Sequence, residues 1–164
     1  MHEDVTRALV LSEEPSGELD ARYVLFTERL GKVRARAKST KKPTSKLVGH
    51  LQPGTFASVR LVETKGVQLV DALKLQAGRI PLPDLYYLEQ LLPEGVPEPV
   101  LWKMLVKGEL VWTAALRALG WDPAAATCTS CRRARPNVFH IGRQEFFCAA
   151  CASRFGPDAV LLKY

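Results

Sequence analysis

Five segments in the first 77 residues carry the pattern of β-strands, with apolar positions that alternate with polar ones or gather into β-branched and aromatic runs. Polar turns separate most of them, and Lys65-Gly66 suits a tight hairpin turn. Residues 39–50 contain Pro43 and many polar side chains, which predicts a long loop with a short helical turn. The five predicted strands are Ala8–Leu11, Tyr23–Thr27, Lys32–Lys38, Thr55–Glu63 and Val67–Leu75.

Five short strands with one long connection after the third favour an OB-fold, a small Greek-key barrel that commonly binds nucleic acid. SH3-like barrels have the same number of strands, so strand count alone leaves them as an alternative. Aromatic residues in such a barrel either fill its core or stack nucleobases. We expect Phe26 and Phe56 to belong to the core, whereas Tyr23 fits either role.

Beyond Pro81 the apolar residues follow helical spacing. Helices are predicted from Asp84 to Leu92, from Pro99 through Val106, and from Leu110 to Leu119. Gly108 either separates the last two or lies within one longer helix. The three tryptophans on or beside these helices are expected to pack against the barrel. An exposed Trp102 beside Lys103 would instead form an apolar, cationic site for an acidic peptide tail.

All four cysteines lie near the C-terminal end, in two C-x-x-C pairs separated by sixteen residues. Such pairs bring thiolates together on one ion, and four sulfurs form the tetrahedral cage that zinc prefers. The sequence therefore predicts one structural Zn²⁺ in a zinc ribbon, with a β-hairpin between the pairs; an iron site remains the alternative. His140 is expected to be a strand residue and not a ligand. The predicted ligands are Cys128, Cys131, Cys148 and Cys151.

Together these patterns predict an α+β chain with three parts. Residues 1–78 form an OB-fold nucleic-acid-binding domain with five strands, and residues 79–127 form a small helical domain. Residues 128–164 form the zinc ribbon, with its four cysteine ligands, and a C-terminal tail.

The net charge of +6 is distributed unevenly along the 164 residues. Residues 1–30 carry a charge of −4 and residues 31–80 a charge of +9; residues 81–127 carry −3 and residues 128–164 carry +4. Two basic blocks separated by one mildly acidic block predict a surface that faces a polyanion.

The first basic block is concentrated in residues 31–46, which contain seven cations and no acidic residue. Val33, Ala35 and Ala37 alternate with the first cations, so we expect these cations on the outer face of the third strand. A second cluster, which also includes Arg143, surrounds the cysteines. The predicted DNA contacts are Lys32, Arg34, Arg36, Lys38, Lys41, Lys42, Lys46, Arg132, Arg133 and Arg135.

Some classes of protein find no support in the sequence. No uninterrupted apolar run approaches the length of a membrane span, and the N-terminus does not resemble a signal peptide, so a cytoplasmic location is expected. No catalytic motif or phosphate-binding loop is present, and His50 has no acid–base companion nearby in sequence. We therefore expect a binding protein and not an enzyme, with no catalytic residues.

The order of several short motifs resembles the RecO family of bacterial recombination mediators. The resemblance rests on Ala8-Leu9-Val10-Leu11, on Leu30-Gly31-Lys32 leading into Ala35-Arg36-Ala37-Lys38, and on Gly49-His50-Leu51-Gln52-Pro53. It continues through Leu91-Leu92-Pro93-Glu94-Gly95 and Ala118-Leu119-Gly120-Trp121 to the two C-x-x-C pairs.

This resemblance implies an OB-fold, a helical domain and a zinc motif, and activity in recombinational DNA repair near the bacterial nucleoid. It implies binding of single- and double-stranded DNA, annealing of complementary strands, partnership with RecR and with the acidic tail of single-stranded-DNA-binding protein, and help in loading RecA. The chain departs from the family in its short helical block and in the thirteen residues after Cys151. Alternatives are an RNA-binding or ribosome-associated module and a protein-binding adaptor.

Overall fold

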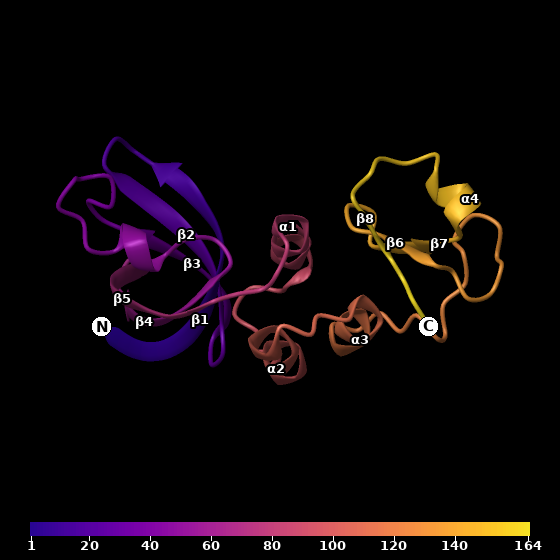
Figure 1. The fold of residues 1–164 in the computed structure, drawn as a ribbon, viewed down its shortest axis with the longest axis horizontal. Helices are drawn as coiled ribbons and strands as arrows, with labels where there is room; N and C mark the ends of the chain where they lie inside the picture. The colour runs from indigo at the N-terminus through magenta and orange to yellow at the C-terminus, as the bar shows by residue number, and fades with distance from the viewer. The chain divides into compact units, whose positions relative to one another are not determined.

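A computed structural model describes residues 1–164, which form two compact units, Met1–Gly108 and Glu109–Tyr164 (Figure 1). None of the helices is both long enough and apolar enough to cross a membrane. The boundaries of the three predicted domains stay a prediction. By contacts within the chain, the first two helices belong with the barrel and the third with the cysteine-rich segment.

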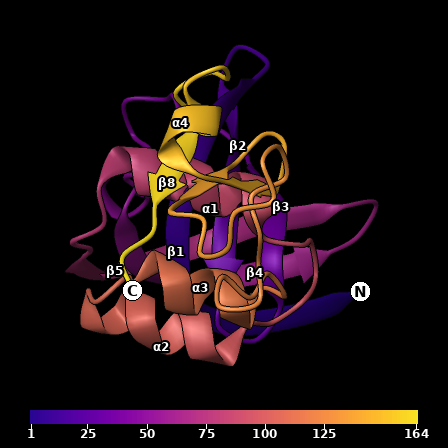
Figure 2. The same cartoon turned by 90° about the vertical axis from the view of Figure 1, so that its right-hand side faces the viewer.

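The first unit is a closed five-stranded barrel with the strand order β1-β2-β3-β5-β4, which is the topology of the predicted OB-fold. Neighbouring strands are antiparallel except β3 and β5, which are parallel and paired only through Arg36 and Gln68. The N-terminal strand is longer than predicted and pairs with β4 along its first half (Figure 2). The strands are β1 (His2–Ser16), β2 (Asp20–Thr27), β3 (Gly31–Ala37), β4 (Thr55–Glu63) and β5 (Val67–Ala77).

Alternation along the strands fills the barrel interior, as the sequence predicts. Ala35 and Ala37 of β3 point inward beside Tyr23 and Leu25 of β2, and all four are fully buried. Small residues on β3 leave room for the Tyr23 ring in the core. The loop after β3 contains the expected short helical turn, η1 (Val48–His50).

Two helices, α1 (Leu82–Leu91) and α2 (Pro99–Lys107), cover part of the outer surface of the barrel. Trp102 of α2 is 4% exposed and lies edge-on between Phe26 and Phe56, with ring centroids 5.8 and 5.7 Å away. Phe26 and Phe56 are thus core residues, as expected. They lie in the layer between the barrel and the helices and not inside the barrel. Gly108 ends α2 in the left-handed conformation with φ of 70°, so it separates two helices.

The second unit combines one helix with a small sheet around the cysteines. The predicted hairpin is present, and a third strand that sequence reasoning missed pairs with its first strand. Trp121 packs on Phe139 in this unit, with ring centroids 5.4 Å apart, a contact that the sequence did not predict. The elements are α3 (Trp112–Ala118), β6 (Val138–His140), β7 (Glu145–Phe147), α4 (Ala149–Ala152) and β8 (Ala159–Leu161).

The segment after α1 closes against the beginning of β3. Gly95 donates its amide to the Lys32 carbonyl at 2.9 Å, and Lys32 and Glu94 form a parallel bridge. Gly31 has φ of 70°, and a Cβ there would overlap the backbone of Val96. Glycine is therefore required both by conformation and by close approach.

Replacing Gly31 by alanine should lower the free energy of unfolding by about 3 kcal/mol or more, because conformational strain and a backbone clash act together. Gly17 is the matched control, since its φ of 82° is similar but a Cβ there meets nothing within 4 Å. Gly17→Ala should cost only about 1 kcal/mol. Urea unfolding of both variants checks the difference, and equal losses would show that the contact with Val96 is unimportant.

Candidate metal centre and nucleic-acid surface

The two C-x-x-C pairs are held by local backbone hydrogen bonds. The Cys128 carbonyl accepts from the Arg132 amide at 2.9 Å, and the Cys148 carbonyl accepts from the Ala152 amide at 2.9 Å. Thr129 donates its amide to the Phe146 carbonyl at 2.9 Å and so ties the first pair to β7. The second pair spans the start of α4. Each thiol pair is therefore positioned by main-chain geometry.

The four Sγ atoms lie within 4.8 Å of one another, so they are placed to bind one metal ion. Cys131 Sγ and Cys148 Sγ are 3.7 Å apart, which is too long for a disulfide. Four sulfurs about 2.3 Å from a central Zn²⁺ would be about 3.8 Å from each other. The cluster is thus already near the size of a tetrathiolate cage, with no open position for substrate.

The pKa values of the cysteine thiols also favour binding of a cation by the cluster. Burial opposes ionisation of Cys128, but hydrogen bonds from backbone groups of Cys131, Cys148 and Ser130 lower the pKa of its thiol to about 6. Hydrogen bonding with Cys148, together with burial, raises the pKa of Cys151 to about 12. A hydrogen bond from the Cys151 backbone likewise lowers the pKa of the Cys148 thiol, so one thiolate forms readily in each pair. Loss of the Cys151 proton needs a positive charge nearby, which a divalent metal supplies.

His140 lies outside the four-sulfur cluster, as the sequence predicts. Its ring is buried, and its Nδ1 accepts a hydrogen bond from the Arg143 amide at 3.2 Å. Arg143 in turn donates to Glu145 and lies over the Phe155 ring at 4.6 Å. His140 and Arg143 are therefore engaged in the structure of the hairpin.

Three other arginines near the metal centre are exposed. Arg132 and Arg135 have left-handed backbones, with φ of 65° and 53°. A bridge between Thr127 and Ala134 closes the loop that contains them. The loop holds Arg132, Arg133 and Arg135 on the surface of this unit, and none of them forms a salt bridge.

The cations of β3 are far less available than the alternation suggests. Lys32 is only 7% exposed, and its ammonium group donates to the Glu89 carbonyl near the end of α1 at 2.8 Å. Burial lowers its pKa. Although Lys32 lies on the outer side of the strand as expected, α1 and the following segment cover that side, so Lys32 does not reach solvent.

Arg34 and Arg36 are exposed but paired with carboxylates. Arg34 Nε donates to Glu94 at 2.7 Å, with Glu14 and Glu89 also within 3.8 Å of its guanidinium group. Arg36 donates to Asp20 through Nε at 3.1 Å and through Nη2 at 2.6 Å. A hydrogen bond from the Ser39 amide and the Arg36 pair lower the pKa of Asp20, and the Arg34 pair lowers that of Glu94. Both carboxylates are thus charged at neutral pH.

Sequence reasoning missed these carboxylates as part of the basic surface. Glu94 lies 60 residues from Arg34, and Asp20 lies 16 residues from Arg36. Only Asp20 had a local signal, because it opens the strand that pairs with β3.

The unpaired cations lie at the end of β3 and in the loop that follows. Lys41 is the best anchored, since its amide donates to the Leu19 carbonyl at 3.0 Å and its ammonium group reaches the Gly17 carbonyl at 3.4 Å. These contacts hold the loop against the β1–β2 turn. The exposed residues without a salt bridge are Lys38, Lys41, Lys42 and Lys46.

The three aromatic residues of the barrel offer no stacking platform. Tyr23 and Phe26 are fully buried, and Phe56 is 3% exposed. Burial in the barrel raises the pKa of Tyr23 to about 12. Aromatic stacking on these three residues therefore plays no part in the site.

A separate pocket of about 260 Å³ lies beside Trp102. Trp102 is buried and forms its floor, and does not project as an exposed anchor. Arg7 lies 6.0 Å from the Trp102 ring and is bound by both carboxylate oxygens of Glu28. Lys103 and Lys107 complete the pocket wall and are exposed. The lining therefore combines apolar side chains with three cations and the Glu28 carboxylate.

These features define a protein that combines an OB-fold barrel with a cluster of four cysteines placed to bind one metal ion. Residues 1–79 match the family model described as "Recombination protein O N terminal". A DNA repair protein RecO from Dehalococcoides mccartyi strain 195 is 36% identical over 180 aligned positions, which cover 92% of this chain and 70% of the relative. The chain belongs to the RecO family.

Other similar proteins cover smaller parts of the chain. A DNA repair protein RecO from Dehalococcoides mccartyi strain BAV1 is 29% identical over 118 positions, 64% of this chain and 46% of the relative. One from Heliobacterium modesticaldum is 42% identical over 64 positions, 39% of this chain and 23% of the relative. The chain thus spans from about half to about two thirds of the length of the two Dehalococcoides relatives.

The metal centre makes a direct prediction: the purified protein should contain about one metal ion per chain. Cys128→Ser and Cys151→Ser should each abolish tight binding and unfold the second unit, because metal binding contributes roughly 10 to 16 kcal/mol in comparable peptides. Metal should also be released as the pH falls, since protons compete for the thiolates.

Elemental analysis and circular dichroism measure these outcomes, and Ser130→Ala, between the ligands of the first pair, is the matched control. A folded protein that contains no metal would contradict the assignment, and so would a Cys151→Ser variant with unchanged metal content.

Proposed function

We propose that this protein is a non-enzymatic DNA-binding factor of recombinational DNA repair, which binds single- and double-stranded DNA and anneals complementary strands. The observation that carries the proposal is the group of unpaired lysines beside an OB-fold barrel, at Lys38, Lys41, Lys42 and Lys46. An unpaired cation can neutralise a DNA phosphate, and so release its counterion, without first breaking a salt bridge within the protein. Membership in a family whose relatives are named as DNA repair proteins supports the same role.

The other basic residues contribute to different extents in this proposal. Arg34 and Arg36 contact phosphates only when the strand displaces Glu94 and Asp20, so each contributes less than an unpaired lysine. The exposed arginines 132, 133 and 135 form a second contact surface on the metal-binding unit. Lys32 is excluded from the contact set by its burial.

Zn²⁺ is the proposed metal, because a cage of four cysteine sulfurs matches its preferred ligands and geometry. Its role is structural, as the four protein ligands leave no position for water or substrate. It keeps the Arg132–Arg135 loop folded beside the ligand Cys131.

Removing the charge of the loop lysines tests the proposal. If the protein contacts about five phosphates of a single strand, the logarithm of the binding constant should fall with the logarithm of the salt concentration with a slope near −3 to −4. Replacing Lys41, Lys42 and Lys46 by alanine should weaken binding to every sequence and make the slope shallower by about 2. Fluorescence anisotropy with a labelled single strand, measured over a range of salt concentrations, gives both quantities.

The matched control removes the same charge elsewhere on the same unit, through Arg29→Ala, Lys74→Ala and Arg79→Ala, three exposed cations that form no salt bridge. This triple variant should keep the slope of the original protein. Equal effects of the two triple variants would mean that net charge, and not the loop, governs binding. Competition by RNA of the same sequence examines the alternative of an RNA-binding module, since preference for RNA requires recognition of the 2′-hydroxyl.

The pocket beside Trp102 suits a protein partner with an acidic tail, and we assign it to the tail of single-stranded-DNA-binding protein. Its apolar floor and two exposed lysines complement an apolar residue flanked by carboxylates. RecR, and help in loading RecA, belong to the proposed role through the family alone, and no surface for them is assigned.

Lys103→Glu should weaken binding of this acidic tail at least about tenfold, because it reverses a charge at the pocket wall. Lys103 is preferable to Trp102, whose burial means that truncation would disturb the fold. Lys74→Glu is the control, and both variants should bind single-stranded DNA with similar affinity. Unchanged affinity of Lys103→Glu for the tail would reject this pocket as the binding site.

A further inference from the structure

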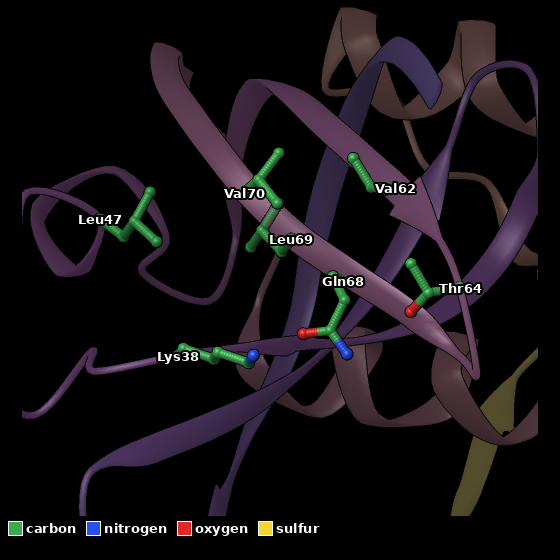
Figure 3. Close-up of a pocket in the computed structure, with 7 residues that line it drawn as sticks. All are labelled: Lys38, Leu47, Val62, Thr64, Gln68, Leu69 and Val70. Carbon is green, nitrogen blue, oxygen red and sulfur yellow. The ribbon is translucent and has the colours of Figure 1, made fainter. Parts of the chain in front are cut away.

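A second pocket, of about 470 Å³, opens where β3 and β5 separate at the end of the barrel (Figure 3). The two strands share only the bridge between Arg36 and Gln68, and β3 ends one residue later, at Ala37. From that point β5 continues without β3 beside it, and Leu47 of the long loop forms the opposite wall. The pocket therefore results from the barrel topology together with the return of the loop.

The register of β5 places an apolar side chain at the mouth of this pocket. Arg60 of β4 pairs with Asp71, whereas Leu61 pairs with Leu69, so Val70 is the extra residue of a β-bulge. A bulge redirects the side chain of its extra residue and often lies next to a functional site. Val70 is 43% exposed, although the neighbouring Leu69 is 3% exposed.

Polar groups from β5 and from the residues that follow β3 and β4 lie at the other side of the pocket. Figure 3 shows the Lys38 ammonium group and the Gln68 amide pointing toward one another, and the Thr64 hydroxyl lies farther along the same wall. Lys38 forms no salt bridge, and the neighbouring loop adds Lys42 and Lys46. The pocket thus has an aliphatic wall, an amide that both donates and accepts hydrogen bonds, and an unpaired cation at its edge.

We propose that this pocket accepts one unstacked nucleobase of single-stranded nucleic acid, with Lys38 at the adjacent phosphate. The proposal rests on the proposed function and extends it, because it adds a contact to bases where the lysines contact only phosphates. The volume lies in the range of small-molecule sites. With the barrel aromatics buried, Leu47 and Val70 supply the apolar surface for the base, and Gln68 faces its polar edge.

A base in this pocket would give a single strand a contact that a duplex cannot make. Bases within a duplex are stacked and paired, so only an unpaired strand offers one to the pocket without the cost of unstacking. The lysine loop serves both forms of DNA, because both have phosphates. Recognition of a base by aliphatic contact and one amide tolerates many sequences, as an annealing factor requires.

The test compares two strands with equal numbers of phosphates, an oligothymidine and the same strand with abasic sites throughout. The original protein should bind the oligothymidine about fivefold more tightly, since a base on an aliphatic surface loses contact with water. The double variant Leu47→Ala/Val70→Ala should reduce this ratio to about one while keeping its salt dependence.

The control variant Val48→Ala/Leu73→Ala truncates two exposed aliphatic residues on the same two segments, outside the pocket. It should keep the fivefold ratio. Circular dichroism verifies folding, and Gln68→Ala replaces the pocket variant if that one is unfolded; it too should reduce the ratio. The same oligonucleotide made with ribose distinguishes RNA from DNA as the source of the base.

Each outcome has one meaning. Measurable binding with a ratio of one in the original protein overturns the base pocket but leaves the proposed function intact. A ratio that survives in the folded pocket variants also overturns it. Absence of binding to either strand defeats the proposed function itself. A protein that binds both strands equally, and whose pocket variants lose only a protein partner, would show that the pocket accepts a protein side chain.

Discussion

The contact between the beginning of β3 and the segment after α1 removes the first two cations of β3, Lys32 and Arg34, from the free basic surface of the barrel. Gly31 allows the Val96 backbone to approach, Gly95 donates to Lys32, and Lys32 reaches the end of α1. The same segment supplies Glu94 to Arg34. This contact adds to the packing of Trp102 on the barrel, and it buries Lys32 and neutralises Arg34 in the first half of the basic strand. The free positive charge is therefore displaced to Lys38 and the loop beyond it.

Within this one basic segment, some cations therefore stabilise the fold, and others remain free for the proposed binding of DNA. The residues of β3 that stabilise the fold are paired, and exposed pairs of this kind contribute little free energy each but still compete with phosphate. The loop lysines have no structural partner of opposite charge, so DNA need not displace one. A loop that is anchored at Lys41 and returns through Leu47 also builds the pocket between β3 and β5. The loop between β3 and β4 thus supplies both the free lysines and one wall of the pocket.

Local patterns in the sequence were sufficient to predict the barrel, the helices, the hairpin and the four-cysteine cluster. Period-two alternation places Ala35 and Ala37 inside because it depends only on neighbours along one strand. Likewise, the C-x-x-C spacing reports a local turn, and the sheet brings the two pairs together.

What could not be predicted depends on contacts between distant residues. Lys32 reads as an outward cation, but a helix 57 residues away covers it. Arg34 and Arg36 read as free, but their carboxylates come from other elements. The strand β8 has only three residues, too few for periodicity to reveal. Trp121 reads as part of the helical layer, yet it packs in the metal-binding unit.

We propose that the free lysines of the β3–β4 loop let this chain bring two complementary DNA strands together. The most direct measurement is the rate at which two complementary oligonucleotides anneal, followed by fluorescence transfer, with and without the protein. The protein should speed annealing at low salt, and this effect should weaken as salt is raised because counterion release drives binding. An annealing rate unchanged by the protein at low salt, under conditions where it binds each strand, would show that the loop lysines do not bring strands together.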